Sequence, residues 1–320
     1  SQFEDIIPGE CTVSWEELRR GRIGMTISTL LPRLHRKDSP LSHYQSREAA
    51  YGISHGQLAY YRALVDRGVL REITDSASLR EHVTAWENDT TGELPIGFIL
   101  SMEGSPPILS AAQISEWYRA GLKILGPAHY GPAPYCHGTG SEGGLTAEGP
   151  DLLREMDQAG MLLDVTHLAD QSFWEALEIF SGPVLASHHN CRALVNADRQ
   201  LADDQIKALI ARGAVIGAAF DCWMLQPDWV IGVTQPDTVT LETVCDHIDH
   251  VCQLAGNADH AGIGTDLDGG FGREQAPGDL ETIADLQKLL ALLAACGYSA
   301  ADIEKIMSGN FLRLLRSAWG

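Results

Sequence analysis

Short apolar stretches alternate along the chain with amphipathic segments of helical period. The apolar stretches predict seven strands, at residues 22–29, 94–104, 121–129, 160–167, 182–189, 213–221 and 260–269. Their hydrophobicity is continuous rather than alternating, which indicates burial on both faces and therefore a parallel sheet. Helices are predicted between them, for example at residues 172–180, 203–213 and 241–256. This alternation predicts an α/β fold built from βα units.

The number of predicted strands is one short of a closed barrel, because a barrel of parallel βα units has eight. Residues 1–21 contain no convincing strand, and the chain begins with Ser1 rather than Met. Two interpretations remain open at this point: an open, doubly wound sheet, or a barrel whose first strand lies upstream of Ser1. No linker and no repeat beyond the βα rhythm divides the chain. We therefore expect a single domain over residues 1–320.

Residues 130–149 form the one long irregular connection, and we expect a mobile loop there. The segment contains Gly138, Gly140 and Gly143 in the spacing of a dinucleotide-binding fingerprint. Those glycines do not lie directly between a strand and the start of a helix, and two prolines interrupt the turn. The spacing is therefore not interpreted as a cofactor site.

The charge of the chain excludes two classes of partner. Its 320 residues include 43 acidic and 23 basic side chains, giving a net charge of −20. Nucleic acids and anionic membranes are therefore not expected as partners. The N-terminus shows no signal-peptide pattern and no apolar run is long enough to span a membrane, so we expect a cytoplasmic protein. The seven cysteines form no C-x-x-C pair, and buried free thiols in a reducing compartment are expected.

Ionisable side chains follow most of the predicted strands at the point where each strand ends. They are Glu103, His129, His167, the pair His188–His189, and Asp266. Burial of such groups is costly unless they are paired or bind a ligand. The carboxyl ends of parallel strands meet at one rim, where barrel enzymes carry their active sites. Imidazoles and carboxylates that converge there are the ligands preferred by zinc and similar divalent ions.

Other polar residues are expected to have structural roles. Asp164 lies within a strand, Asp221 is interpreted as a loop cap, and Asp268 as a turn or supporting residue. His247 and His250 are three apart on a predicted helix and could hold a metal, but a solvated acidic helix face is the preferred interpretation. The sequence has neither the H-E-x-x-H signature of zinc proteases nor the G-x-S-x-G elbow of serine hydrolases.

Taken together, the motifs resemble those of the renal (membrane) dipeptidase family, peptidase family M19 of the amidohydrolase superfamily. The resemblance extends from about residue 12 to the end of the chain, with the motifs in the right order. They are LSMEG with Glu103, LLDVTH with His167, LASHH with His188, NADRQLADDQ with Arg199, GIGTDLDG with Asp266, and MSGNFLRLL. The resemblance implies a TIM-like (β/α)8 barrel of metal-dependent hydrolase type. It also implies zinc-dependent hydrolysis of dipeptides by metal-activated hydroxide, often with a D-residue at the C-terminal position.

The resemblance implies two zinc ions per chain. Glu103 would bridge them, and His167 and His188 would be ligands of the second ion. The remaining two ligands of the family form a His-x-Asp pair on the first barrel strand, and no such pair precedes Glu103 in this sequence. We therefore expect a missing strand one, carried with the His-x-Asp pair on roughly 40 residues upstream of Ser1, the size of one βα unit.

The resemblance also assigns substrate-binding and catalytic residues. His129 would stabilise the oxyanion, Arg199 would bind the terminal carboxylate of the substrate, and Asp266 would move a proton from the water to the leaving amine. The expected partner is a small dipeptide, with a homodimer left open. Two alternatives remain: an amidohydrolase-type enzyme acting on a non-peptide amide or ester, or an inactive barrel if the His-x-Asp strand is absent.

Overall fold

The computed structural model describes residues 10–33 and 44–320. Within this range the chain forms two compact units. The 24–183 unit comprises Gly24–Pro183 with the C-terminal Arg316–Gly320. The 184–315 unit comprises Val184–Leu315 together with the described residues that precede Gly24. The expectation of one domain over the whole chain stays a prediction.

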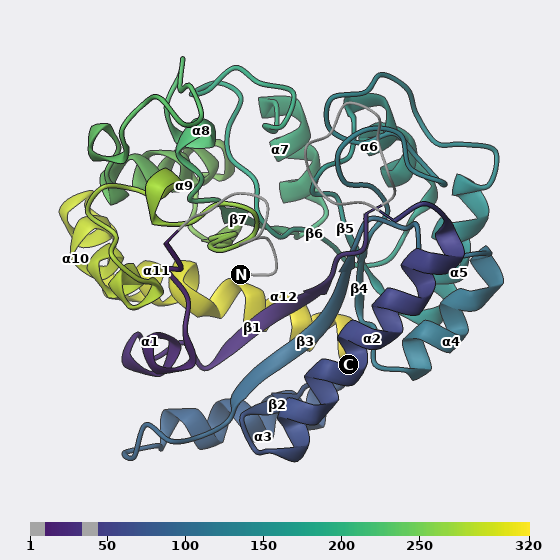
Figure 1. The fold of residues 1–320 in the computed structure, drawn as a ribbon. Helices are drawn as coiled ribbons and strands as arrows, with labels where there is room; N and C mark the ends of the chain where they lie inside the picture. The colour runs from purple at the N-terminus through teal and green to yellow at the C-terminus, as the bar shows by residue number, and fades with distance from the viewer. Residues whose placement is uncertain (1–9, 34–43) are drawn as a thin grey trace. The chain divides into compact units, whose positions relative to one another are not determined.

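The 24–183 unit contains a parallel sheet organised around one long strand. Its strands are β1 (Met25–Leu30), β2 (Leu70–Glu72), β3 (Ile96–Glu103), β4 (Ile124–Gly126) and β5 (Leu162–Asp164). β1 runs along β3 over six residue pairs. β2 pairs with the beginning of β3, β4 pairs with its end, and β5 follows β4. Figure 1 shows β1 alongside the long strand β3. All these pairings are parallel, as the continuous apolar runs predict.

Helices in the same unit begin and end at residues whose chemistry favours those positions. They are α2 (Arg47–Asp66), α3 (Ser76–Glu87), α4 (Ile114–Arg119), α5 (Gly149–Ala159) and α6 (Asp170–Ile179), with a 3-10 turn η1 (Ala111–Gln113) before α4. Ser46 caps α2 by accepting a hydrogen bond from the Ala49 N–H, and Asp75 forms a capping box with Ser78 at α3. Gly160 ends α5 in the left-handed conformation, where glycine carries no Cβ penalty.

The 184–315 unit contains three parallel strands and the remaining helices. The strands are β6 (Val184–Ala186), β7 (Val215–Ala218) and β8 (Ala261–Ile263), and β7 pairs with both others. The helices are α1 (Trp15–Arg20), α7 (Asp203–Ala211), α8 (Cys222–Leu225), α9 (Leu241–Ala255), α10 (Lys288–Ala295), α11 (Ala300–Glu304) and α12 (Asn310–Trp319), whose last residues belong to the other unit. Short turns complete it: η2 (Pro236–Thr238), η3 (Arg273–Gln275), η4 (Ile283–Gln287) and η5 (Lys305–Gly309).

All seven predicted strands are present, and the α/β prediction is confirmed. The structure adds β2, whose three residues are too short to give a periodic signal in the sequence. The expected strand one would precede Ser1, so it stays a prediction.

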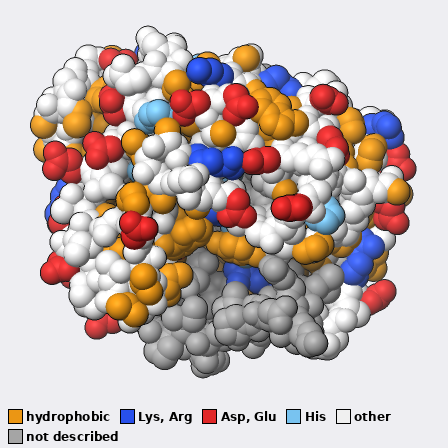
Figure 2. Space-filling model, turned by 90° about the horizontal axis from the view of Figure 1, so that it is seen from above, with side chains coloured by type: hydrophobic (Ala, Val, Ile, Leu, Met, Phe, Trp, Pro, Cys, Tyr) orange, Lys and Arg blue, Asp and Glu red, His pale blue; other side chains and the backbone are white. Residues whose placement is uncertain are grey.

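The surface and the cysteines bear on the expectations drawn from composition. In the face drawn in Figure 2, red carboxylate side chains are interspersed with blue lysine and arginine side chains. No helix among the described residues has the length and apolarity needed to cross a bilayer. None of the seven cysteines forms a disulfide bond within the described residues, and five are buried. The expectation of burial is wrong for Cys11 and Cys296, which are exposed.

Candidate metal and substrate site

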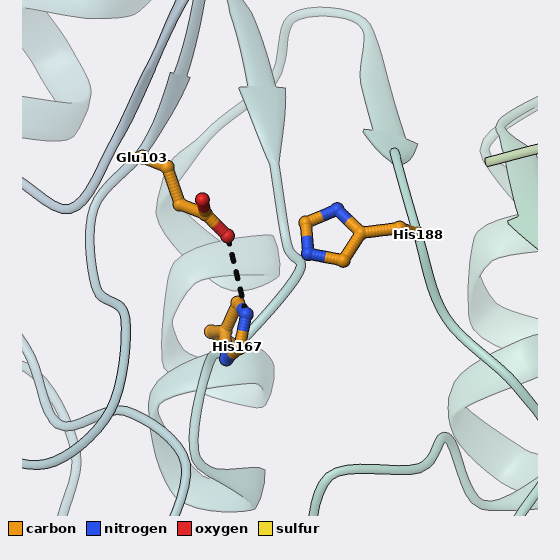
Figure 3. A group of neighbouring side chains, drawn as sticks. All are labelled: Glu103, His167 and His188. Carbon is orange, nitrogen blue, oxygen red and sulfur yellow. Dashed lines mark ion pairs between the residues drawn. The ribbon is translucent and has the colours of Figure 1, made fainter. Parts of the chain in front are cut away.

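In the 24–183 unit, a carboxylate and an imidazole from two strand ends point toward each other. Glu103 is the last residue of β3, and His167 lies three residues beyond the end of β5. Nε2 of His167 lies 3.1 Å from Oε1 of Glu103, and only 3% of the His167 side chain is exposed. Figure 3 shows this pair as a dashed line. Two strands of one parallel sheet therefore deliver a carboxylate and an imidazole to one point, as the strand-end pattern predicts.

His129 lies beside this pair, beyond the end of β4. Its Nε2 lies 3.8 Å from Oε1 of Glu103, and its ring centroid lies 4.3 Å from that of His167. The ring of Tyr130 packs edge-on against both imidazoles. Nη2 of Arg33 lies 3.4 Å from Nε2 of His129. The sequence reasoning missed Arg33, although its position shortly after β1 follows the same strand-end rule.

The conformation of His167 directs its Nε2 atom toward Glu103. Its backbone is left-handed, with φ of +67°, which is uncommon for a residue other than glycine. The other ring nitrogen, Nδ1, lies 3.1 Å from the hydroxyl oxygen of Thr139. Histidine ligands of metals commonly have such a partner on the second nitrogen. The arrangement therefore fits a metal ligand, with Nε2 as the ligating atom.

The 184–315 unit brings together a second histidine and carboxylate from strand ends. His188 follows β6 and Asp266 follows β8. Nε2 of His188 lies 3.9 Å from Oδ2 of Asp266, and Nδ1 of His188 lies 2.8 Å from the Ser187 hydroxyl. The backbone of Asp266 is left-handed, with φ of +57°. Nδ1 of His188 is thus occupied in the way that Nδ1 of His167 is.

Arg199 lies in the same unit, with its guanidinium buried. Only 1% of its surface is exposed, and its Nη2 donates a hydrogen bond of 2.9 Å to the carbonyl of His188. Its Nη1 has no hydrogen-bond partner within the described residues. Burial, and next the positive charge of Arg199, hold the pKa of neighbouring His189 well below its usual value. His189 is therefore neutral. It lies beside the buried Arg199 guanidinium, whose Nη1 can donate a hydrogen bond to an anionic ligand.

The aspartates predicted to be structural have the expected contacts. Asp221 caps α8 by accepting a bond of 3.4 Å from the Trp223 N–H, and burial raises its pKa to about 7. Asp268 accepts three hydrogen bonds from Thr12 and Val13, which ties the N-terminal segment to the loop after β8. Both carboxylates hold backbone in place. Asp164 does the same, since it accepts a bond from the Thr166 N–H.

The solvated face predicted for the two helical histidines is wrong for His247. This residue of α9 is only 2% exposed, and its Nδ1 accepts a bond of 3.1 Å from the Cys191 N–H. Burial lowers the pKa of His247 to about 4, which keeps it neutral. His250, one turn on, forms a partly buried pair with Asp203. The helical period places His247 and His250 on neighbouring sides of α9. The packing of other elements against the helix decides which side is buried.

Residues 130–149 are irregular, as expected, but they are held by many hydrogen bonds. Short bridges join Tyr130 to Thr139, Cys136 to Leu145, and Gly138 to Leu168. The segment thus connects the rim after β4 with the rim after β5. The expected mobility stays a prediction. α5 begins only at Gly149, the last residue of the segment and well after Gly143, which fits no dinucleotide turn.

The donor set fits a divalent metal ion. Glu103 and His167 in the 24–183 unit, and His188 in the 184–315 unit, each offer one ligand atom, and carboxylates and imidazoles are donors that zinc prefers. Within the 24–183 unit, Nε2 of His167 and Oε1 of Glu103 lie 3.1 Å apart, an arrangement that a cation or a proton between the two atoms stabilises.

Comparisons with known proteins agree with this chemistry. A profile of the membrane dipeptidase family, peptidase family M19, matches residues 13–319. Dipeptidase verJ of Clonostachys rogersoniana is 27% identical over 313 residues, which cover 94% of this chain and 74% of that protein. The chain spans between 47% and 76% of the lengths of five curated relatives that it matches.

Solved structures show the same fold. An M19 metallopeptidase, dipeptidase AC, superposes with a TM-score of 0.83 at 22% identity, covering 98% of this chain and 91% of the other. A metallopeptidase from Rhodobacter sphaeroides, solved with a phosphinate mimic of L-Ala-D-Ala, gives a TM-score of 0.82 at 22% identity and covers 99% and 94%. The resemblance seen in the motifs is thereby confirmed. The chain belongs to the membrane dipeptidase family, peptidase family M19, and shares its hydrolase class and barrel-type α/β fold.

Proposed function

We propose that the protein is a zinc-dependent dipeptidase. The observation that carries the proposal is the 3.1 Å approach of His167 Nε2 to Glu103 Oε1 at the ends of β5 and β3 in a chain of the M19 family. A cation is stabilised between two ligand atoms that lie this close, and the family is one of metallopeptidases.

Glu103, His167 and His188 are the residues that would hold the proposed zinc, of which the family resemblance implies two ions per chain. Zinc, when bound, polarises the scissile carbonyl and lowers the pKa of water toward neutrality. The side chains of this chain fit that task because each histidine has its Nδ1 engaged by a hydroxyl. That leaves Nε2 of each ring for the metal.

Three side chains are proposed to act on the substrate. Arg199 binds the terminal carboxylate through Nη1, the donor that has no partner among the described residues. His129, which has the Arg33 guanidinium next to its Nε2, stabilises negative charge on the carbonyl oxygen of the tetrahedral intermediate. Asp266 takes a proton from the attacking water and gives it to the leaving amine.

The substrate proposed is a dipeptide whose C-terminal residue has L or D configuration. Support for the D configuration comes from the Rhodobacter sphaeroides metallopeptidase, which was solved with a mimic of L-Ala-D-Ala. The five buried, free thiols suit a reducing compartment, and we include a cytoplasmic location in the proposal.

The test is a panel of L–L and L–D dipeptides, assayed after chelation and again after zinc is returned. We expect hydrolysis that chelation abolishes and zinc restores. Dipeptide amides and simple esters serve as controls for the alternative of a non-peptide amidohydrolase. Activity that survives chelation, or activity on the amides and esters alone, would contradict the proposal. Zinc content near zero in the purified chain would favour an inactive barrel instead.

A further inference from the structure

The residues next to Thr139 lie between the two rim segments that carry His129 and His167. The Gly138 N–H donates to the Gly131 carbonyl at 2.9 Å, and the Gly131 N–H donates to the Thr139 carbonyl at 2.7 Å. On the other side, the Thr139 N–H donates to the His167 carbonyl at 2.8 Å. A short piece of the 130–149 segment is thus hydrogen-bonded to the backbone on both sides, within a single unit. Its position relative to His167 is therefore well fixed.

The side chain of Thr139 is directed at the imidazole of His167. Thr139 is buried, with 5% of its surface exposed. Its hydroxyl oxygen lies 3.1 Å from Nδ1 of His167 and 3.4 Å from the carbonyl oxygen of the same residue. A hydroxyl has one hydrogen to donate and two lone pairs. The carbonyl can only accept, so when the hydroxyl hydrogen is donated to it, a lone pair of the hydroxyl remains for an N–H at Nδ1.

This bonding pattern has a consequence for the opposite side of the ring. A neutral imidazole with its proton on Nδ1 carries its lone pair on Nε2. Nε2 is the atom that faces Glu103 across 3.1 Å. A lone pair at this position can ligate a metal ion, whereas a proton there would have to be displaced first.

We propose that Thr139 is a positioning residue that holds His167 in the Nδ1-protonated form, so that its Nε2 lone pair is presented to zinc. The inference rests on the proposed function, in which His167 is a ligand. It gives the 130–149 segment a role: the segment supplies the hydroxyl that prepares a metal ligand.

The test compares three variants for their affinity for zinc alone, measured by competition with a chromophoric chelator. Thr139→Val keeps the shape and removes the hydroxyl, and we expect its affinity to fall about 10- to 100-fold. Thr139→Ser keeps the hydroxyl and should stay within about threefold of wild type. Thr146→Val is the matched control, because the Thr146 hydroxyl lies in the same segment and donates to the Pro134 carbonyl rather than contacting His167. It should bind zinc as wild type does.

A second readout is independent of zinc. Long-range ¹H–¹⁵N correlation spectra of the metal-free protein report which nitrogen of His167 is protonated. We expect Nδ1 in wild type and in Thr139→Ser, and a shift toward protonated Nε2 in Thr139→Val. Thermal unfolding of each metal-free variant separates a loss of fold from a loss of positioning.

The outcomes distinguish this inference from the proposed function. Wild-type affinity in Thr139→Val, an equal loss in Thr146→Val, or protonated Nε2 in the wild type would each overturn the role of Thr139 while leaving the dipeptidase proposal intact. A wild-type chain that takes up no zinc would overturn the proposed function, and the spectra would still decide the tautomer.

Discussion

Gly138 passes so close to His129 that a Cβ on the glycine would overlap the carbonyl oxygen of the histidine. The same Cβ would meet Cβ of Ala128 at 2.9 Å. The atom that this Cβ would overlap belongs to the backbone rather than to the end of a flexible side chain. The backbone segment would therefore have to move to make room for it. The neighbouring Gly140 is different, since its Cβ would meet open space and only its φ of +75° disfavours a side chain.

We therefore expect Gly138→Ala to be the more damaging of the two substitutions. Overpacking should reduce the free energy of unfolding by about 2–3 kcal/mol. Gly140→Ala should cost about 1 kcal/mol, the price of a left-handed alanine. Urea unfolding of both variants measures the difference. An equal loss of unfolding free energy in the two variants would show that Gly138 does not pack tightly against His129. Zinc affinity should fall in Gly138→Ala alone.

Arg199→Ala should raise KM for free dipeptides about 10- to 100-fold, because a charge-assisted hydrogen bond contributes about 1.5–3 kcal/mol. Dipeptide amides lack the carboxylate, so the same substitution should leave their KM nearly unchanged. Arg192→Ala is the control, since Arg192 donates to backbone carbonyls of the same segment. Steady-state kinetics with both substrate types measures the effect. If KM rises equally for both substrate types, Arg199 supports the fold through its bond to His188 and does not bind substrate.

Asp221 should make the stability of the protein depend on pH. Burial, and to a lesser degree the charge of Asp266, raises the pKa of Asp221 from 3.8 to about 7 in the folded state. Between about pH 4 and pH 7 the folded state binds the extra proton, so stability falls as the pH rises through this window. A pKa shift of this size changes the free energy of unfolding by at most about 4 kcal/mol.

Asp221→Asn should remove this dependence while its side-chain oxygen still accepts from Gln275. Urea unfolding of metal-free protein at pH 5 and pH 8 tests it: the variant should gain stability relative to wild type at pH 8. Asp228→Asn, at an exposed position, should follow the wild type at both values. Parallel curves for wild type and Asp221→Asn would show that Asp221 is ionised in the folded protein at neutral pH.

Zinc should stabilise the folded chain, because a ligand that binds only the folded state adds about 2.7 kcal/mol at 100 times its dissociation constant. Thermal unfolding with and without zinc measures this gain, with magnesium as the control ion. Glu103→Gln keeps the size of the side chain and removes its charge, and it should abolish most of the gain. A zinc effect that persists unchanged in Glu103→Gln would place the bound ion elsewhere.

The sequence by itself determined seven of the eight strands in the described part of the chain, several of the helices and the residues at the strand ends. Continuous apolar runs and helical periodicity are local properties, so β3, β5 and their terminal residues Glu103 and His167 could be read from the chain. The family could also be recognised, because its motifs are short and contiguous.

Only the tertiary structure decided the contacts between distant segments. The hydroxyl of Thr139 reaches His167 across 28 residues of sequence, and Arg33 reaches His129 across 96. His247 belongs to a helix whose composition suggests a solvated face, yet packing buries it against Cys191. Such contacts have no signature in the sequence. They depend on which faces of the sheet and helices pack together in the folded chain, and local propensity does not specify this packing.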